Sequence, residues 1–205
     1  MTRKHLASLL SIGILLFLFS LPAVSQKALD AIVKKGEIRI GTTGNQPPYS
    51  MKSKTGELMG YEVDLAKALA TTMGVKLKLV EMPFSELIAA LKSGKIDAIM
   101  SGMTITPERN LSMLFAGPYI ISGKSMLTKS SKVSAFNADT GASGKKYKIV
   151  SLKGSTSEEF VKTVMSKHES ITVDNYNDVV NMIINDQADA MVADKPICVI
   201  TIMKN

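Results

Sequence analysis

Cysteine, histidine and tryptophan are almost missing from this sequence of 205 residues, which has one cysteine, two histidines and no tryptophan. The single cysteine, Cys198, excludes an intramolecular disulfide and, within an apolar run, is expected to be a small buried residue. With only His5 and His168 available, the residues that build Cys/His zinc sites and Ser–His triads are too few. We therefore predict no zinc site and no His-dependent triad, and our expectation for the chain is no metal, no cofactor and no catalytic residue.

Dense runs of positive charge are also scarce, although the formal net charge is +7. The one short basic run, residues 145–148, is flanked by glycine and serine and is expected to be a solvated loop. Nucleic-acid binding calls for a denser patch with interleaved aromatic residues. Gly141–Gly144 lacks the spacing of a phosphate-binding loop, and no low-complexity segment is evident.

The N-terminus has the order of a secretory signal peptide. Arg3 and Lys4 precede an apolar run that is densest at 9–21, and the small residues Ala23 and Ser25 follow. The alternative is an uncleaved anchor, but the dense core is short for a spanning helix, which needs about 20 residues. We predict cleavage after Ser25, export to the periplasm of a Gram-negative cell, and no lipid anchor, since no cysteine lies near the cleavage site.

Apolar strands alternate with amphipathic helices in two successive units, which predicts an α/β fold with largely parallel sheets. The first unit has predicted strands at 37–42, 76–80 and 96–100 and helices at 61–73 and 85–92. The second has predicted strands at 148–152, 171–175 and 190–193 and helices at 157–165 and 178–184. An extended segment at 119–123 joins the units, and a long polar loop is expected at 129–147.

The segment 93–109 is the most informative. Thr106 is a good helix N-cap and Pro107 suits the first helical position, which places Arg109 in the first turn. A cation there opposes the helix dipole, and that arrangement makes sense if an anion also sits there. Amide N–H groups, a hydroxyl and a guanidinium would together hold a carboxylate. The alternative is a solvated arginine paired with an acidic side chain such as Glu108.

Motifs along residues 38–196 together resemble the substrate-binding proteins of bacterial polar amino-acid ABC importers, solute-binding protein family 3. The first matches lie at Pro47-Pro48-Tyr49, at 60–69 and at Ser93-Gly94-Lys95. Further matches follow in order at Gly102-Met103, Glu108-Arg109, Pro118-Tyr119, 152–156 and 188–194. The resemblance implies a two-lobed periplasmic-binding-protein-like fold of type 2, whose lobes close on a ligand about a hinge.

The resemblance also implies roles for charged and polar residues. Arg109 matches the arginine that binds the ligand carboxylate, and Asp194 the aspartate that binds its ammonium group. Gly102 and Thr104 match positions that contact these groups through backbone and hydroxyl. Thr156 matches a second carboxylate donor, from lobe 2. The structural alternatives are a tight turn at Gly102, a helix N-cap at Asp194 and a capping box formed by Ser155 and Glu158.

Two further positions bear on the ligand's side chain. Phe84 matches a residue that packs on that side chain, although an ordinary core phenylalanine fits the spacing equally well. Gln46 stands where many family members have an aromatic residue that stacks on the ligand. An amide offers hydrogen bonds instead of an aromatic face, so the ligand class stays open.

From the resemblance we expect a signal peptide at 1–25, lobe 1 at 26–118, a hinge crossover at 119–123 and lobe 2 at 124–205. In the family the chain then returns to lobe 1, so we expect a C-terminally truncated chain with an incomplete second lobe and return crossover. The expected function is capture of a polar amino acid for an ABC permease of the inner membrane, as a monomer and without catalysis. The alternatives are a periplasmic cyclohexadienyl or arogenate dehydratase and the sensor domain of a receptor.

Overall fold

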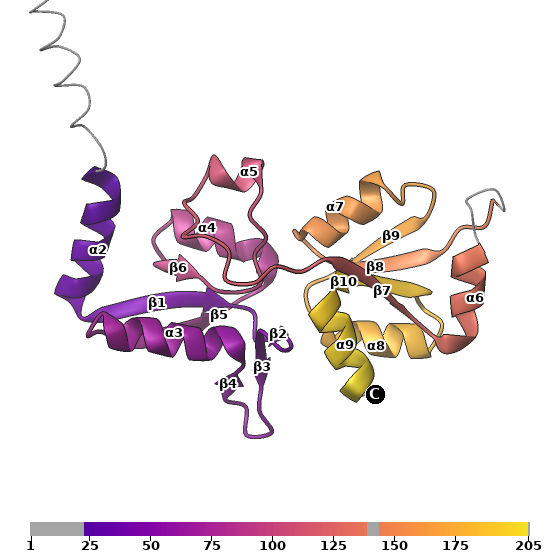
Figure 1. Cartoon of the computed structure of the whole chain (residues 1–205), viewed down its shortest axis with the longest axis horizontal. Coiled ribbons are helices and arrows are strands. Elements are labelled where there is room, and N and C mark those ends of the chain that lie inside the picture. Colours follow the sequence, from indigo (N-terminus) through magenta and orange to yellow (C-terminus); the bar gives the residue numbers. More distant parts are fainter. Residues whose placement is uncertain (1–22, 139–143, 205) are drawn as a thin grey trace, which may run out of the picture.

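The computed structural model describes residues 23–138 and 144–204, and it shows two α/β halves side by side (Figure 1). Of the predicted signal peptide at 1–25, residues 1–22 lie outside the described residues, and residues 23–25 form the start of a helix. Helix α2 (Ala23–Lys35) leads into the first half and ends before Gly36, which adopts a positive φ of 68°. No helix in the described part of the chain is long and apolar enough to cross a membrane.

The first half is built on a parallel three-stranded sheet in the order β5-β1-β6. Ile38 and Ile40 alternate into its core, where Ala66 and Ala70 of the covering helix meet them. The elements are strands β1 (Glu37–Thr42), β5 (Lys76–Glu81) and β6 (Ala98–Ile99), with helices α3 (Tyr61–Thr72), η1 (Phe84–Glu86), α4 (Leu87–Lys92) and α5 (Pro107–Asn110).

A second, small antiparallel sheet in this half was not predicted. It contains β2 (Asn45–Gln46), β3 (Ser50–Lys52) and β4 (Leu58–Met59) in sequence order. Strands of two or three residues are too short to carry a readable period of two. The sheet matters because its first strand places Gln46 beside the candidate site.

The second half contains a four-stranded sheet in the order β7-β10-β8-β9, in which only β7 is antiparallel to its neighbour. The chain enters it through the irregular segment 119–123, which runs between the halves (Figure 1). The elements are strands β7 (Lys124–Thr128), β8 (Lys148–Leu152), β9 (Glu169–Val173) and β10 (Ala190–Asp194), with helices α6 (Ser130–Ala138), α7 (Thr156–Thr163), α8 (Asn177–Ile184) and α9 (Lys195–Lys204).

The prediction of a polar loop throughout 129–147 is wrong, because α6 occupies its first half. The ring of Phe136 packs against that of Tyr147, with 4.3 Å between centroids, and Tyr147 is buried within the predicted solvated basic run. This contact joins residues eleven positions apart, so no helical or strand periodicity in the sequence indicates it. Strand β6 is also shorter than predicted, since only Ile40 and Gly41 of β1 pair with it.

The two halves share an apolar core. One cluster of buried side chains includes Phe84 and Leu87 from the first half and Leu152, Tyr176 and Met191 from the second. Where the halves approach, Gly154 lies so close to η1 that an added Cβ would come within 3.2 Å of the Ser85 Cα. The halves are therefore in direct contact, which is a closed arrangement.

Candidate functional site

The turn that carries Arg109 forms as the sequence predicts. The Thr106 hydroxyl accepts a hydrogen bond from the Arg109 backbone N–H at 3.3 Å, and Pro107 is the first residue of α5. Pro107 needs no hydrogen-bond partner at that position because it has no N–H. The cap fixes the start of the helix and thereby the direction in which the Arg109 side chain leaves it.

The Arg109 guanidinium bridges the two halves. Its Nη1 donates to the Thr104 carbonyl at 2.7 Å, and its Nη2 donates to the Gly154 carbonyl at 3.0 Å. Burial lowers the pKa of Arg109, while the exposed carboxylates Glu159 and Glu108 act in the opposite direction. Within residues 23–138 and 144–204 no carboxylate lies at ion-pair distance from Arg109. The simple surface ion pair is therefore not what this structure shows.

Hydroxyl groups from both halves meet beside this arginine. The Thr104 and Thr156 Oγ1 atoms are 3.3 Å apart. Thr156 opens α7, whose cap is Ser155, and the Ser155 Oγ accepts from the Ser157 and Glu158 amides at 3.2 Å each. The capping box is modified, because the Glu158 carboxylate reaches back to the Gly154 N–H at 2.6 Å.

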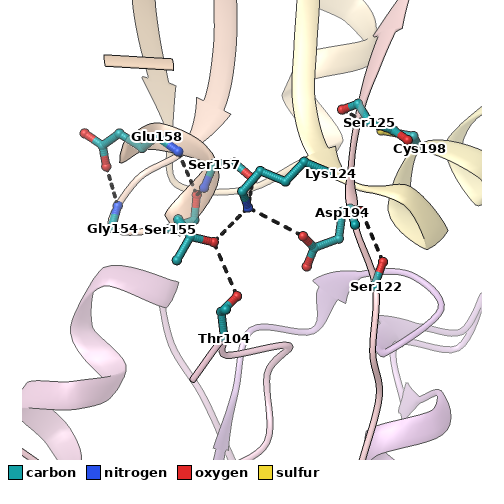
Figure 2. Close-up of polar contacts among 12 residues, drawn as sticks. Thr104, Ser122, Lys124, Ser125, Gly154, Ser155, Ser157, Glu158, Asp194 and Cys198 are labelled. Carbon is teal, nitrogen blue, oxygen red and sulfur yellow. Dashed lines mark hydrogen bonds and ion pairs between the residues drawn. The ribbon is translucent and has the colours of Figure 1, made fainter. Parts of the chain in front are cut away.

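Lys124 connects this cluster to Asp194, the predicted partner of the ligand's ammonium group, as Figure 2 shows. Its Nζ is 2.7 Å from the Thr156 Oγ1, 3.1 Å from the Ser157 Oγ and 3.7 Å from the Asp194 Oδ1. Lys124 begins β7 and Asp194 ends β10, and the antiparallel register sets them opposite each other. Burial lowers the pKa of Lys124, with a contribution from Arg109, while Asp194 acts to raise it.

The Gly102 turn is held from behind by a buried acid. Glu62 is 1% exposed, and its Oε1 accepts from the Gly102 N–H at 2.6 Å and from the Tyr119 hydroxyl. Burial raises the pKa of Glu62, and the two hydrogen bonds oppose that effect. Gly102 has a φ of 58°, so the expected tight turn is present. The Gly102 amide is therefore engaged by Glu62 in this structure.

Gln46 and Phe84 are both buried next to the cluster, at 3% and 5% exposure. The Gln46 Nε2 donates to the Thr43 Oγ1 at 3.0 Å and to the Ser101 Oγ at 3.3 Å. The Phe84 ring lies 5.7 Å from the Arg109 Cζ, within range of a cation–π contact. Phe84 is thus a core residue that also supports the arginine, and a role for either residue toward a ligand stays a prediction.

All seven predicted site residues lie in one region. Gln46, Phe84, Gly102, Thr104, Thr156 and Asp194 line one narrow hollow, and Arg109 contacts it through Thr104. That hollow has a volume of only about 10 Å³, barely room for one water molecule. A neighbouring cavity of about 270 Å³ shares Gly102, Thr104 and Asp194 with it and extends along Tyr49 and Tyr119.

Sequence reasoning missed Lys124, Ser157 and Glu62. No local pattern marked Lys124, because Ser125–Thr128 mixes polar and apolar residues and the strand is only partly buried. Glu62 lies in the first turn of a helix, where an exposed acid that favours the helix dipole is typical, so its burial has no local signal.

Comparisons with known proteins identify the family of this chain. Residues 38–195 match the model of the bacterial extracellular solute-binding proteins, family 3. The chain belongs to this family. It is 29% identical over 191 residues to a cyclohexadienyl dehydratase of Pseudomonas aeruginosa, covering 93% of this chain and 71% of the relative. It is 35% identical over 175 residues to an L-arginine-binding protein of the same species, covering 84% and 66%.

Solved structures of family members confirm the two-lobed α/β fold. An ancestral amino-acid-binding protein, a precursor of cyclohexadienyl dehydratase, superposes with a TM-score of 0.78 at 37% identity, covering 82% of this chain and 74% of that one. The chain thus spans about two thirds to three quarters of these family members. With Arg109, two threonine hydroxyls, Lys124 and Asp194 converging where the halves meet, the arrangement can hold a small solute that carries both signs of charge.

Proposed function

We propose that this protein captures a free polar amino acid between its two lobes and presents it to an ABC permease in the inner membrane. The observation that carries the proposal is the Arg109 guanidinium, which caps backbone carbonyls of both lobes and has no carboxylate of its own at ion-pair distance among the described residues. A ligand carboxylate would replace these two carbonyls as its partner, in the bidentate geometry that arginine prefers.

The remaining groups of the cleft suit the rest of an α-amino acid. Thr104 and Thr156 provide hydroxyl donors from opposite lobes, 3.3 Å apart. Asp194, at the carboxyl end of β10, provides an anion for the ammonium group. The relatives support this assignment, because they include proteins named for binding arginine, histidine and cystine.

The narrow hollow requires the lobes to separate before a ligand enters. In the proposal, residues 119–123 are the hinge, 26–118 and 124–205 are the lobes, and the mature protein is a periplasmic monomer that starts near Gln26. The crossover suits this role because it is irregular and starts at Tyr119, whose hydroxyl is anchored to Glu62. A hinge of this kind absorbs dihedral changes while both lobes stay rigid.

A second candidate function is a dehydratase, favoured by the relative of that name, which aligns over 93% of this chain. The half-buried Lys124 beside Asp194 is a titratable pair of the kind used in proton transfer. On the binding proposal these groups only hold the solute, so incubation leaves it unchanged.

One experiment separates the two functions. The purified protein is titrated calorimetrically with the common amino acids, and in parallel it is incubated with prephenate and arogenate while the aromatic product is followed by ultraviolet absorption. Saturable binding of an amino acid without any aromatic product supports the binding protein. Catalytic release of the aromatic product would refute it in favour of the enzyme.

A further inference from the structure

The charges in the cleft exceed what a neutral zwitterionic solute needs. A zwitterion requires one fixed cation for its carboxylate and one fixed anion for its ammonium group. The cleft provides two cations, Arg109 and Lys124, and one anion, Asp194. Arg109 and Lys124 are close enough to repel each other, which contributes to the lowered pKa of Lys124.

Lys124 belongs to the cleft and not to the outer surface. Its ammonium group contacts Thr156, Ser157 and Asp194, and all three residues line the narrow hollow. Its side chain is 26% exposed, so its charge is only partly solvated. Glu159 also attracts the Lys124 ammonium group, but it is exposed and solvent screens its charge, so it does not neutralise Lys124.

Binding of a zwitterion rearranges this charge balance. The ligand's ammonium group would take Asp194 as its partner, and Lys124 would then lose the one ion pair that it makes within the described residues. A half-buried lysine without a counter-ion is costly, and its pKa falls or it seeks another anion. A second negative group on the solute supplies that anion. A basic side chain would instead bring a third cation into the same space.

We infer that Lys124 sets the specificity of the cleft and that the solute is an acidic amino acid, with a second carboxylate held by Lys124 and the Thr156 and Ser157 hydroxyls. This inference rests on the proposed function, whose α-amino-acid clamp it keeps unchanged. It distinguishes the protein from relatives named for binding arginine or histidine. Selection works by attraction to Lys124 and by repulsion of cationic side chains.

The test compares isosteric solutes by calorimetry on the full protein. L-Glutamate and L-glutamine have nearly the same shape, but the side chain of glutamate ends in a carboxylate, which Lys124 would bind, and that of glutamine in a neutral amide. We expect glutamate to bind at least about tenfold more tightly than glutamine, and L-arginine to bind more weakly than either. Lys124→Gln should bring the glutamate-to-glutamine ratio to about one, whereas Lys124→Arg should keep the preference for glutamate.

Each outcome decides the question. Arginine or glutamine binding to the wild type as tightly as glutamate would overturn the inference, and this comparison needs no variant to fold. An unchanged preference in a Lys124→Gln protein with native circular dichroism would overturn it too. If arginine binds at least as tightly as glutamate and Arg109→Ala abolishes that binding, the proposed function stands without the inference. If no amino acid binds the wild type, both are refuted.

Discussion

Replacement of Arg109 by alanine tests the centre of the proposed site. In the structure its guanidinium donates two hydrogen bonds, at 2.7 and 3.0 Å, to carbonyls on opposite lobes. In the bound protein it is expected to hold the ligand carboxylate in a desolvated cleft. Removing one partner of such a charge pair costs about 2–5 kcal/mol of affinity, which corresponds to about thirtyfold to several thousandfold in Kd.

The effect on stability should be much smaller than the effect on binding. The side chain is half-buried and its carbonyl partners regain water once it is gone, so we expect a loss of about 1 kcal/mol in unfolding free energy. The ligand-free protein should also open more readily, because the bridge from Thr104 to Gly154 is broken. Small-angle scattering should then show a larger radius of gyration.

The assay is calorimetric titration of the wild type and Arg109→Ala with the amino acid that binds best. Lys67→Ala is the matched control, since Lys67 is an exposed cation of α3 that pairs with Asp64 on its own helix. The control should keep the wild-type Kd. Equal affinity of Arg109→Ala and the wild type would refute the assignment of the carboxylate site.

Three further outcomes are expected. Burial raises the pKa of Glu62 above its ordinary 4.5, so near that pH the folded state binds more protons than the unfolded state. The melting temperature should therefore fall as pH rises from about 4.5 through the raised pKa, and Glu62→Gln should remove that dependence. Gly60→Ala should abolish stable folding, because Gly60 has a φ of 127° and an added Cβ would lie 2.5 Å from the Tyr49 carbonyl oxygen. The control Gly56→Ala has nothing within 4 Å of its Cβ and should cost only about 1–2 kcal/mol in urea unfolding. Asp97→Asn should lower the unfolding free energy by about 2 kcal/mol, because it breaks the two-point pairing with the partly buried Arg39. An unchanged urea midpoint would contradict that pairing.

Local sequence signals determined most of the elements and one side of the site. The strand Glu37–Thr42 and the cap at Thr106 follow from apolar alternation and from side-chain oxygens next to free amides, which are properties of a few neighbouring residues. The family motifs then indicated which residues converge. Gln46, Phe84 and Asp194, far apart in the sequence, do line one hollow.

Only the tertiary structure decided which groups those residues meet. The partners of Lys124 lie 32 to 70 positions away, on α7 and at the end of β10, and strand register brings them together. Glu62, on α3, is buried behind the Gly102 turn by a hydrogen bond that joins residues 40 positions apart, although its place in the sequence is typical of an exposed helix start. Burial and long-range pairing set the charge balance of the cleft, and neither has a local pattern in the sequence.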